Sequence, residues 1–123
     1  MNKIFSGMST TDTPLTKNEF LVYNSGESSY VISPIIICNT STEAKTISLW
    51  HVNKEKWTKF WESYGTSEKF YEVFADNILY SNLSVAANTS EILSLNIINN
   101  SKELLIIKAS TGVAINIYGS YSG

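Results

Sequence analysis

From about residue 19 to its end, the chain alternates short apolar runs with polar turn residues. Runs of this kind, bounded by Gly, Asn and Ser, are typical of β-strands. The last run is the clearest, because Val113, Ile115 and Ile117 alternate with smaller or more polar residues, as in a half-buried strand. The predicted strands are residues 20–23, 30–38, 45–53, 77–85, 89–96, 103–109 and 113–118. This spacing predicts an all-β fold, an antiparallel β-sandwich or jelly-roll-like domain of about 7–8 strands.

Two of these runs also indicate how the strands are placed in the sheets. Residues 30–38 are apolar on both faces, and such a strand is usually covered on both sides. Pro34 lies within this run and cannot donate a ladder hydrogen bond, so it predicts either an edge strand or a bulge. In the run 45–53, alternation places Ile47 and Leu49 on one face.

Residues 54–77 interrupt the strand pattern with an aromatic-rich insertion. Seven of its side chains are aromatic: Trp57, Phe60, Trp61, Tyr64, Phe70, Tyr71 and Phe74. The first four lie at i, i+3, i+4 and i+7, which predicts one face of a helix. Thr66 or Ser67 is suited to cap a second short helix that carries the other three. The alternative is a long hairpin about Gly65.

Three interpretations of these seven aromatic residues stay open. They could cover one open end of the sandwich as ordinary core. They could form a contact surface for another protein, because Trp and Tyr dominate interface hot spots. They could also form a platform on which sugars stack, which requires Trp57 or Trp61 to be exposed to solvent.

Residues 1–16 differ from the rest of the chain. They are polar, rich in Ser and Thr, and contain Pro14, so we expect an N-terminal arm outside the core. Residues 17–123 then form the β-sandwich domain, with the insertion at 54–77. A chain of 123 residues accommodates one core of this kind.

Composition and charge exclude several classes of protein. With 43% apolar and 16% charged residues, the chain is not of the disordered class. A net charge of −2 and the absence of arginine argue against a nucleic-acid partner. We expect no membrane partner, since neither a signal peptide nor an apolar stretch of membrane-spanning length is found. These features predict a protein that is made in a cytosol.

Candidate chemistry is sparse. His51 is the single histidine and Cys38 the single cysteine, whereas a metal site normally needs several such ligands. We expect His51 to be a strand residue with a hydrogen-bonded imidazole and Cys38 to be a small buried apolar residue. Phosphate-binding glycine loops and nucleophile-elbow motifs are absent. The sequence predicts no catalytic, cofactor-binding or metal-ligating residue.

Acidic residues of the insertion offer one enzymatic alternative. A pair drawn from Glu62, Glu68, Glu72 and Asp76 could serve a glycosidase, which needs two carboxyl groups facing each other across a cleft. The simpler interpretation is that these residues form the solvated face of an amphipathic segment. We therefore expect a non-enzymatic protein.

Two short motifs carry a resemblance to a known group. Cys38-Asn-Thr-Ser41 ends the second predicted strand, and Ala86-Ala-Asn88 precedes the fifth. Together with the strand order over residues 19–120, they resemble small β-sandwich virion structural proteins of tailed bacteriophages, of the tail, neck, baseplate or head-decoration type. Two features depart from that group: residues 54–74 replace its Gly- and Ala-rich loop, and Pro34 interrupts the second strand.

The resemblance implies a structural role without a cofactor. A virion component is assembled in the host cytoplasm and contacts other virion proteins and copies of itself, so symmetric self-association is expected. We favour the tail, neck or baseplate apparatus, with the aromatic segment and the arm as contact surfaces. The alternatives are a capsid decoration (cement) protein and a carbohydrate-binding module for host surface glycans.

Overall fold

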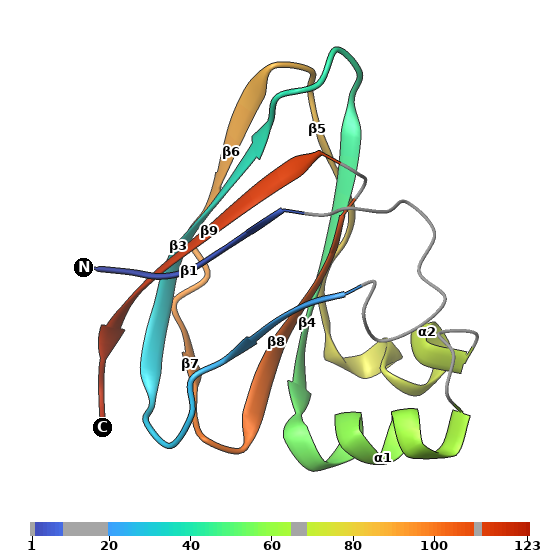
Figure 1. Ribbon diagram of the computed structural model, residues 1–123, viewed down its shortest axis with the longest axis vertical. Coiled ribbons are helices and arrows are strands. Elements are labelled where there is room, and N and C mark those ends of the chain that lie inside the picture. Colours follow the sequence, from blue (N-terminus) through green and yellow to red (C-terminus); the bar gives the residue numbers. More distant parts are fainter. Residues whose placement is uncertain (1, 9–19, 65–68, 110–111) are drawn as a thin grey trace.

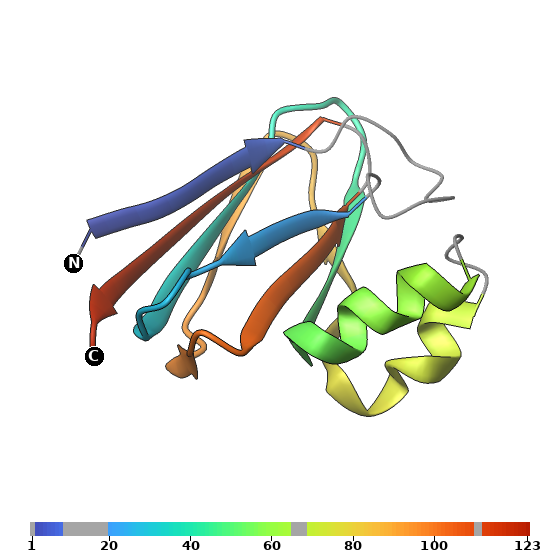
Figure 2. The same ribbon diagram turned by 60° about the horizontal axis from the view of Figure 1, so that its bottom comes forward.

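The protein folds as two antiparallel sheets packed face to face, with a helical layer on one of them (Figures 1 and 2). The computed structural model describes residues 2–8, 20–64, 69–109 and 112–123. The strands are β1 (Asn2–Met8), β2 (Leu21–Asn24), β3 (Tyr30–Asn39), β4 (Lys45–Asn53), β5 (Ile78–Val85), β6 (Thr89–Leu93), β7 (Ile97–Asn99), β8 (Glu103–Ala109) and β9 (Val113–Tyr121). The helices are α1 (Lys54–Tyr64), α2 (Phe70–Val73) and the 3-10 turn η3 (Ala75–Asn77).

The strand order is that of a jelly roll. Sheet A has the order β1-β9-β3-β6, with β7 also paired to β3, and sheet B has the order β2-β8-β4-β5. Along the chain, most consecutive strands alternate between the two sheets, as in a fold of two Greek keys. The predicted all-β sandwich is thereby confirmed.

A first core lies between the sheets. It is formed by the inward positions of both sheets, including Ile35 and Ile37 of β3 and Ile115 of β9. Ile47 and Leu49 of β4 face it together, as their alternation predicts. The period of two along each strand therefore decides which side chains meet in the middle.

A second core lies outside sheet B. Trp50 and Val52 of β4 and Leu104 and Ile106 of β8 point away from sheet A, and the two helices pack onto them. Figure 2 shows α1 and α2 beside sheet B, on the side away from sheet A. The insertion is helical in its described part, so the hairpin alternative is wrong, while the caps expected at Thr66 or Ser67 lie outside the described residues.

Pro34 produces a bulge and not an edge. β3 is an inner strand, paired with β9 on one side and with β6 and β7 on the other. Its register against β9 shifts between Ile32 and Ile35, and the Ser33–Pro34 peptide bond there is cis. The partner on the other side also changes at this point, from β7 to β6. The missing N–H of Pro34 therefore falls where the ladder is already interrupted.

The prediction that the N-terminal residues lie outside the core is wrong for residues 2–8. Residues 2–8 form β1, which pairs with β9 at the edge of sheet A. The register shifts between Lys3 and Phe5, and Ile4 and Phe5 both pack against the first core. The polar composition of residues 1–16 gave no strand pattern for β1. An edge strand needs few apolar side chains, because its neighbour supplies the hydrogen bonds. The remainder of the expected arm, residues 9–16, lies outside the described residues.

The pairing of β1 at this edge requires a glycine at position 119. A Cβ atom at this position would lie 2.7 Å from Cδ1 of Ile4 and 2.8 Å from the carbonyl oxygen of Val31. Neither contact is sterically acceptable, so β1, β9 and β3 approach each other only over a glycine.

The predicted strand 89–96 is shorter in the structure. β6 ends at Leu93, Asn96 has a left-handed backbone with φ 50°, and β7 begins at Ile97. Asn tolerates this conformation well, and here it separates two short strands that pair with different parts of β3.

Candidate interaction surface

Most of the aromatic insertion is core. Four of the seven candidate contact residues are buried: Trp57, Phe60, Phe70 and Phe74. The ring of Phe70 lies at the centre, 4.6 Å from Phe20 and 5.0 Å from Trp50 between centroids. These four side chains therefore do not present the exposed rings that the interface interpretation requires, and the interpretation as ordinary core describes them better. They cover the outer face of sheet B, and not an end of the sandwich.

The other three candidates lie at the rim of this aromatic layer. Tyr64 and Tyr71 are 52% and 46% exposed, and each still packs its ring against a buried aromatic residue. Trp61 is half-buried, and its indole Nε1 is buried without a hydrogen-bond partner among the described residues. A sugar platform on Trp57 is excluded by its burial, because stacking needs an open ring face.

The acidic residues of the insertion lie on its solvent side. Glu62, Glu72 and Asp76 are exposed, and the Glu72 carboxylate lies 3.5 Å from the Lys69 ammonium. Glu68 lies outside the described residues. Among the residues that the structure describes, no group of His, Cys, Asp and Glu side chains is suited to hold a metal ion. This arrangement is that of a solvated helix face.

His51 belongs to a polar cluster at one end of the sandwich. Its Nε2 lies 3.1 Å from Oδ1 of Asn99 and 3.7 Å from the Glu103 carboxylate. The Asn99 amide is fully buried and donates to Oγ of Ser25, and that hydroxyl donates to the Asn99 carbonyl. The imidazole is thus satisfied by hydrogen bonding, as expected. Ser25 is held by backbone and amide groups, so the cluster joins the two sheets and does not have the arrangement of a Ser-His nucleophile.

The two motifs of the resemblance meet at the opposite end. The buried Asn39 amide donates to the carbonyl oxygens of Val85 and Ala86, at 3.0 and 3.2 Å. The N–H of Asn88 donates to the Ser41 carbonyl. Both motifs are therefore structural, since they close the end of the sandwich between β3 and the β5–β6 turn. Cys38 is half-buried, where a buried residue was expected, and its sulfur lies 3.3 Å from Oγ of Ser90.

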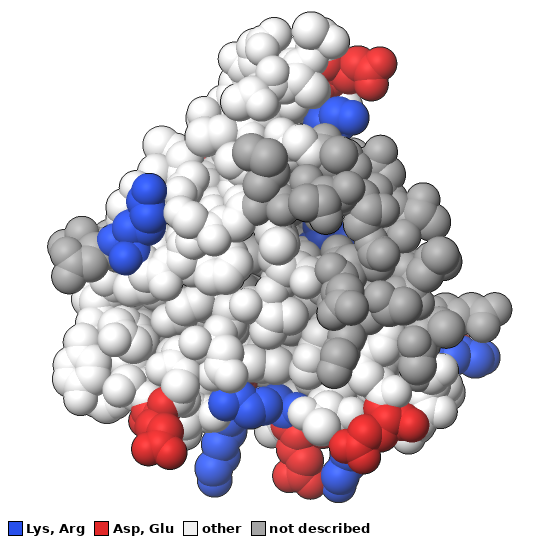
Figure 3. All heavy atoms as spheres, viewed as in Figure 1, with Lys and Arg blue, Asp and Glu red and all other residues white. Residues whose placement is uncertain are grey.

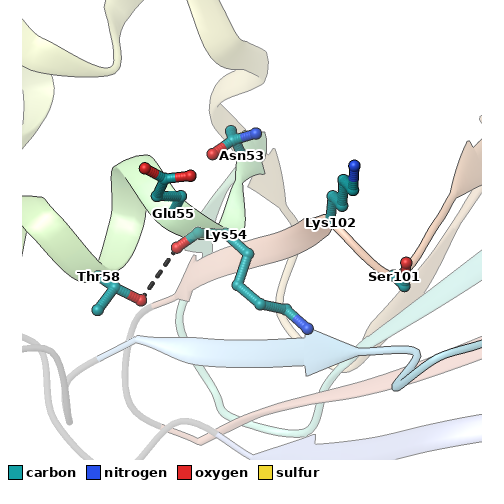
Figure 4. A pocket seen from close by; sticks show the side chains of 6 residues that line it. All are labelled: Asn53, Lys54, Glu55, Thr58, Ser101 and Lys102. Carbon is teal, nitrogen blue, oxygen red and sulfur yellow. Dashed lines mark hydrogen bonds between the residues drawn. The ribbon is translucent and has the colours of Figure 1, made fainter.

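A pocket of about 420 Å³ lies where β4 enters α1 (Figure 4). Its lining residues are Asn53, Lys54, Glu55, Thr58, Ser101 and Lys102. In Figure 4 the Lys54 and Lys102 side chains extend in different directions, so their ammonium groups do not converge on one point. The Asn53 side chain already accepts the N–H of Lys56 in the first turn of the helix. The pocket therefore lacks the convergent donors of an anion site.

The outer face of sheet A carries apolar residues that no described element covers. On β3, Val31, Pro34 and Ile36 alternate with the inward residues and point away from sheet B. Register extends this face sideways, because Ile36 pairs with Ile92 of β6 and Val31 pairs with Ile98 of β7. Ile92 and Ile98 are 65% and 57% exposed. Contiguous exposed apolar residues of this kind often mark an interaction site.

Charge is nearly absent from this face. Among the described residues of the five strands of sheet A, only Lys3 and Glu91 are charged. Figure 3 shows charged side chains gathered along the lower edge, of which α1 forms the right part in Figure 1, and few on the left side over β1 and β9. No described helix is long and apolar enough to cross a membrane. The open face of sheet A is therefore the candidate interaction surface of this protein.

Comparisons with known proteins add no further evidence on this surface. No family model, no curated protein and no solved structure matches the chain. Sequence reasoning missed the surface, although its signal was present in the strand 30–38, which is apolar on both faces. We expected both faces of that strand to be covered, and the described structure covers only one.

Proposed function

We propose that this protein is a non-enzymatic structural component of a tailed-phage virion that acts through protein–protein contacts. The observation that carries the proposal is the open, nearly uncharged outer face of sheet A, with Ile92 and Ile98 exposed. A surface of this kind stabilises an assembly by burying apolar area against a neighbour.

Two further features support the proposal. The sequence resembles small virion proteins at the Cys38–Ser41 and Ala86–Asn88 motifs, and these motifs close one end of the fold. The jelly-roll order is also common in viral capsid domains, although the same fold serves lectins and cupins and so does not decide function by itself.

Within the virion we favour the tail, neck or baseplate over the head surface. The alternative within this class is a capsid decoration protein, which uses the same kind of contact on a different part of the particle. A module for host surface glycans is less well supported, because Trp57 is buried and Trp61 is half-buried.

The test is to ask whether the protein is present in particles. Particles of the phage or prophage that encodes this chain would be purified by density gradient, and their proteins would be quantified by mass spectrometry. We expect the chain at a fixed copy number per particle, and immunogold labelling would separate tail from head. Its absence from intact, infectious particles would contradict the proposal.

A further inference from the structure

We propose that the open face of sheet A binds the same face of a second copy of this chain, about a twofold axis that runs along the strands. This inference rests on the proposed function, for which it names one partner. The axis would place β1 of one copy over β6 of the other, since these strands form opposite edges of the sheet.

The chemistry of this face favours a second copy of the chain as its partner. Its apolar members come from four strands: Val31, Pro34 and Ile36 of β3, Ile92 of β6, Ile98 of β7 and Tyr118 of β9. A partner that brought charges onto this area would have to desolvate them without a counter-charge, and burying even an unpaired polar group costs about 2–7 kcal/mol. A second copy of the same face brings no charge to its centre.

The charged residues of sheet A lie away from the centre of this face. Glu91 alternates with the outward Ile92, so it points to the other side of sheet A. Lys3 pairs with Tyr118 at the β1 edge, and its ammonium lies 6.0 Å from the centroid of that ring. Among the described strand residues, Lys3 is therefore the charge that the outer face carries, and it lies at the rim.

This single rim charge distinguishes two possible axes. A twofold axis along the strands exchanges the two edges, so it sends the two Lys3 side chains to opposite edges of the interface. An axis across the strands would instead bring the two β1 edges, each with its Lys3, onto one another. Like charges on facing edges are unfavourable, and charge placement therefore selects the first arrangement.

The outer face of sheet A is large enough for a specific dimer. The ten residues of β3 span about 33 Å at about 3.3 Å per residue, and the four side-by-side strands β1, β9, β3 and β6, about 4.8 Å apart, give a width of about 19 Å. Each copy would then bury about 600 Å², or about 1,200 Å² in total, at the lower end of specific interfaces. The expected product is a reversible dimer, packed like the two sheets of an aligned sandwich at about 30°.

The experiment compares two exposed isoleucines on opposite sheets. Ile92 lies on the proposed face, while Ile78 lies on edge strand β5 of sheet B and is 38% exposed. Sedimentation equilibrium would measure the dimer dissociation constant of the parent chain, of Ile92→Lys and of the matched control Ile78→Lys. We expect Ile92→Lys to raise this constant at least about 30-fold, the loss of a hot-spot residue. Ile78→Lys should leave it within a factor of about two, since most surface substitutions are nearly neutral.

New charges at Ser94 test the axis. Ser94 follows β6 at nearly the same level of the sheet as Lys3, and it is exposed next to the buried Leu93. The proposed axis brings Lys3 of one copy over Ser94 of the other. We therefore expect Ser94→Lys to weaken the dimer and Ser94→Glu to strengthen it, each by a few-fold, as for facing charges at an interface rim.

The same two variants in a Lys3→Glu background provide the control. There the order should invert, so that Ser94→Lys gives the tighter dimer. Circular dichroism of each variant would check that the fold is kept. If the order of the two Ser94 variants is the same in both backgrounds, the proposed axis is wrong.

Failure of this inference is distinguishable from failure of the proposed function. A chain that stays monomeric at millimolar concentration, or whose dimer is unaffected by Ile92→Lys, overturns the inference. Detection of that chain in purified particles would still support the proposed function. A dimer with the expected variant pattern, in a protein absent from particles, would support self-association and contradict the virion role.

Discussion

The outer faces of both sheets carry apolar residues, but only the outer face of sheet B is covered in the described structure. β4 and β8 carry Trp50, Val52 and Ile106 on the outer face of sheet B, and the helical insertion buries them. β3 carries Val31 and Ile36 on the outer face of sheet A, and no described element covers them. An apolar pattern on both faces of a strand therefore predicts that both faces are covered. It does not show that the covering element belongs to the same chain.

The helical layer formed by α1 and α2 differs from an ordinary helix pair in the type of side chain that it buries. Nearly all its buried side chains are aromatic, and their rings meet edge to face or tilted at 4.6 to 6.3 Å. Such pairs contribute about 0.5–1.5 kcal/mol each beyond the area they bury. A four-residue helix such as α2 would not be stable alone, so this packing holds it in place.

The largest expected effect is the loss of this cover. Phe70→Ala removes the central ring and should lower the free energy of unfolding by about 3–5 kcal/mol, as for other buried Phe truncations. Chemical denaturation followed by Trp fluorescence would measure the change, and Tyr64→Ala at the exposed rim is the matched control. If Phe70→Ala leaves no folded protein, Phe70→Leu gives a smaller, measurable loss. A loss for Phe70→Ala no larger than that for Tyr64→Ala would show that the helices add little stability.

An intermediate effect is expected in alkali. Partial burial raises the pKa of Tyr71 at the rim of the aromatic layer, and burial together with nearby Tyr30 raises the pKa of Tyr23 in the first core. The folded state therefore favours the neutral phenols. Their contribution is fully present below pH about 10, where the unfolded chain starts to ionise, and is lost as the pH rises through the folded-state pKa values.

Urea unfolding between pH 8 and about 11.5 would test this dependence. Tyr71→Phe and Tyr23→Phe should each make the decline in stability shallower, and Tyr121→Phe, at an exposed position, controls for loss of a hydroxyl. Identical slopes for the parent chain and both variants would mean that neither layer excludes water as the structure indicates.

The smallest expected effect is on the open face. Ile92→Ala should change the unfolding free energy of the dilute monomer by less than about 0.5 kcal/mol, because the side chain is already in water. Ile106→Ala, on the covered face, should cost about 2–5 kcal/mol. Equal losses for the two isoleucines in thermal or chemical unfolding would remove the distinction between the faces.

Local pattern explains much of what could be predicted. The alternation of apolar residues anticipated most strands, and the spacing of Trp57, Phe60 and Trp61 anticipated helix α1. Edge strand β1 escaped prediction, because its stability comes from hydrogen bonds to β9 and from Gly119, which lies far along the chain. The candidate surface was also not predicted, because whether a strand face is covered depends on segments that lie far away in the sequence.

By itself, the sequence determined the class of fold, the position of the aromatic insertion and the scarcity of catalytic groups. Those features depend on residue type and short-range periodicity. Only the tertiary structure decided that the insertion is helical, that four of its seven aromatic residues are core, that Pro34 marks a bulge, and that sheet A presents an open face. The physical reason is that burial depends on which distant segment arrives at a surface, and the helices can cover only one of the two sheets.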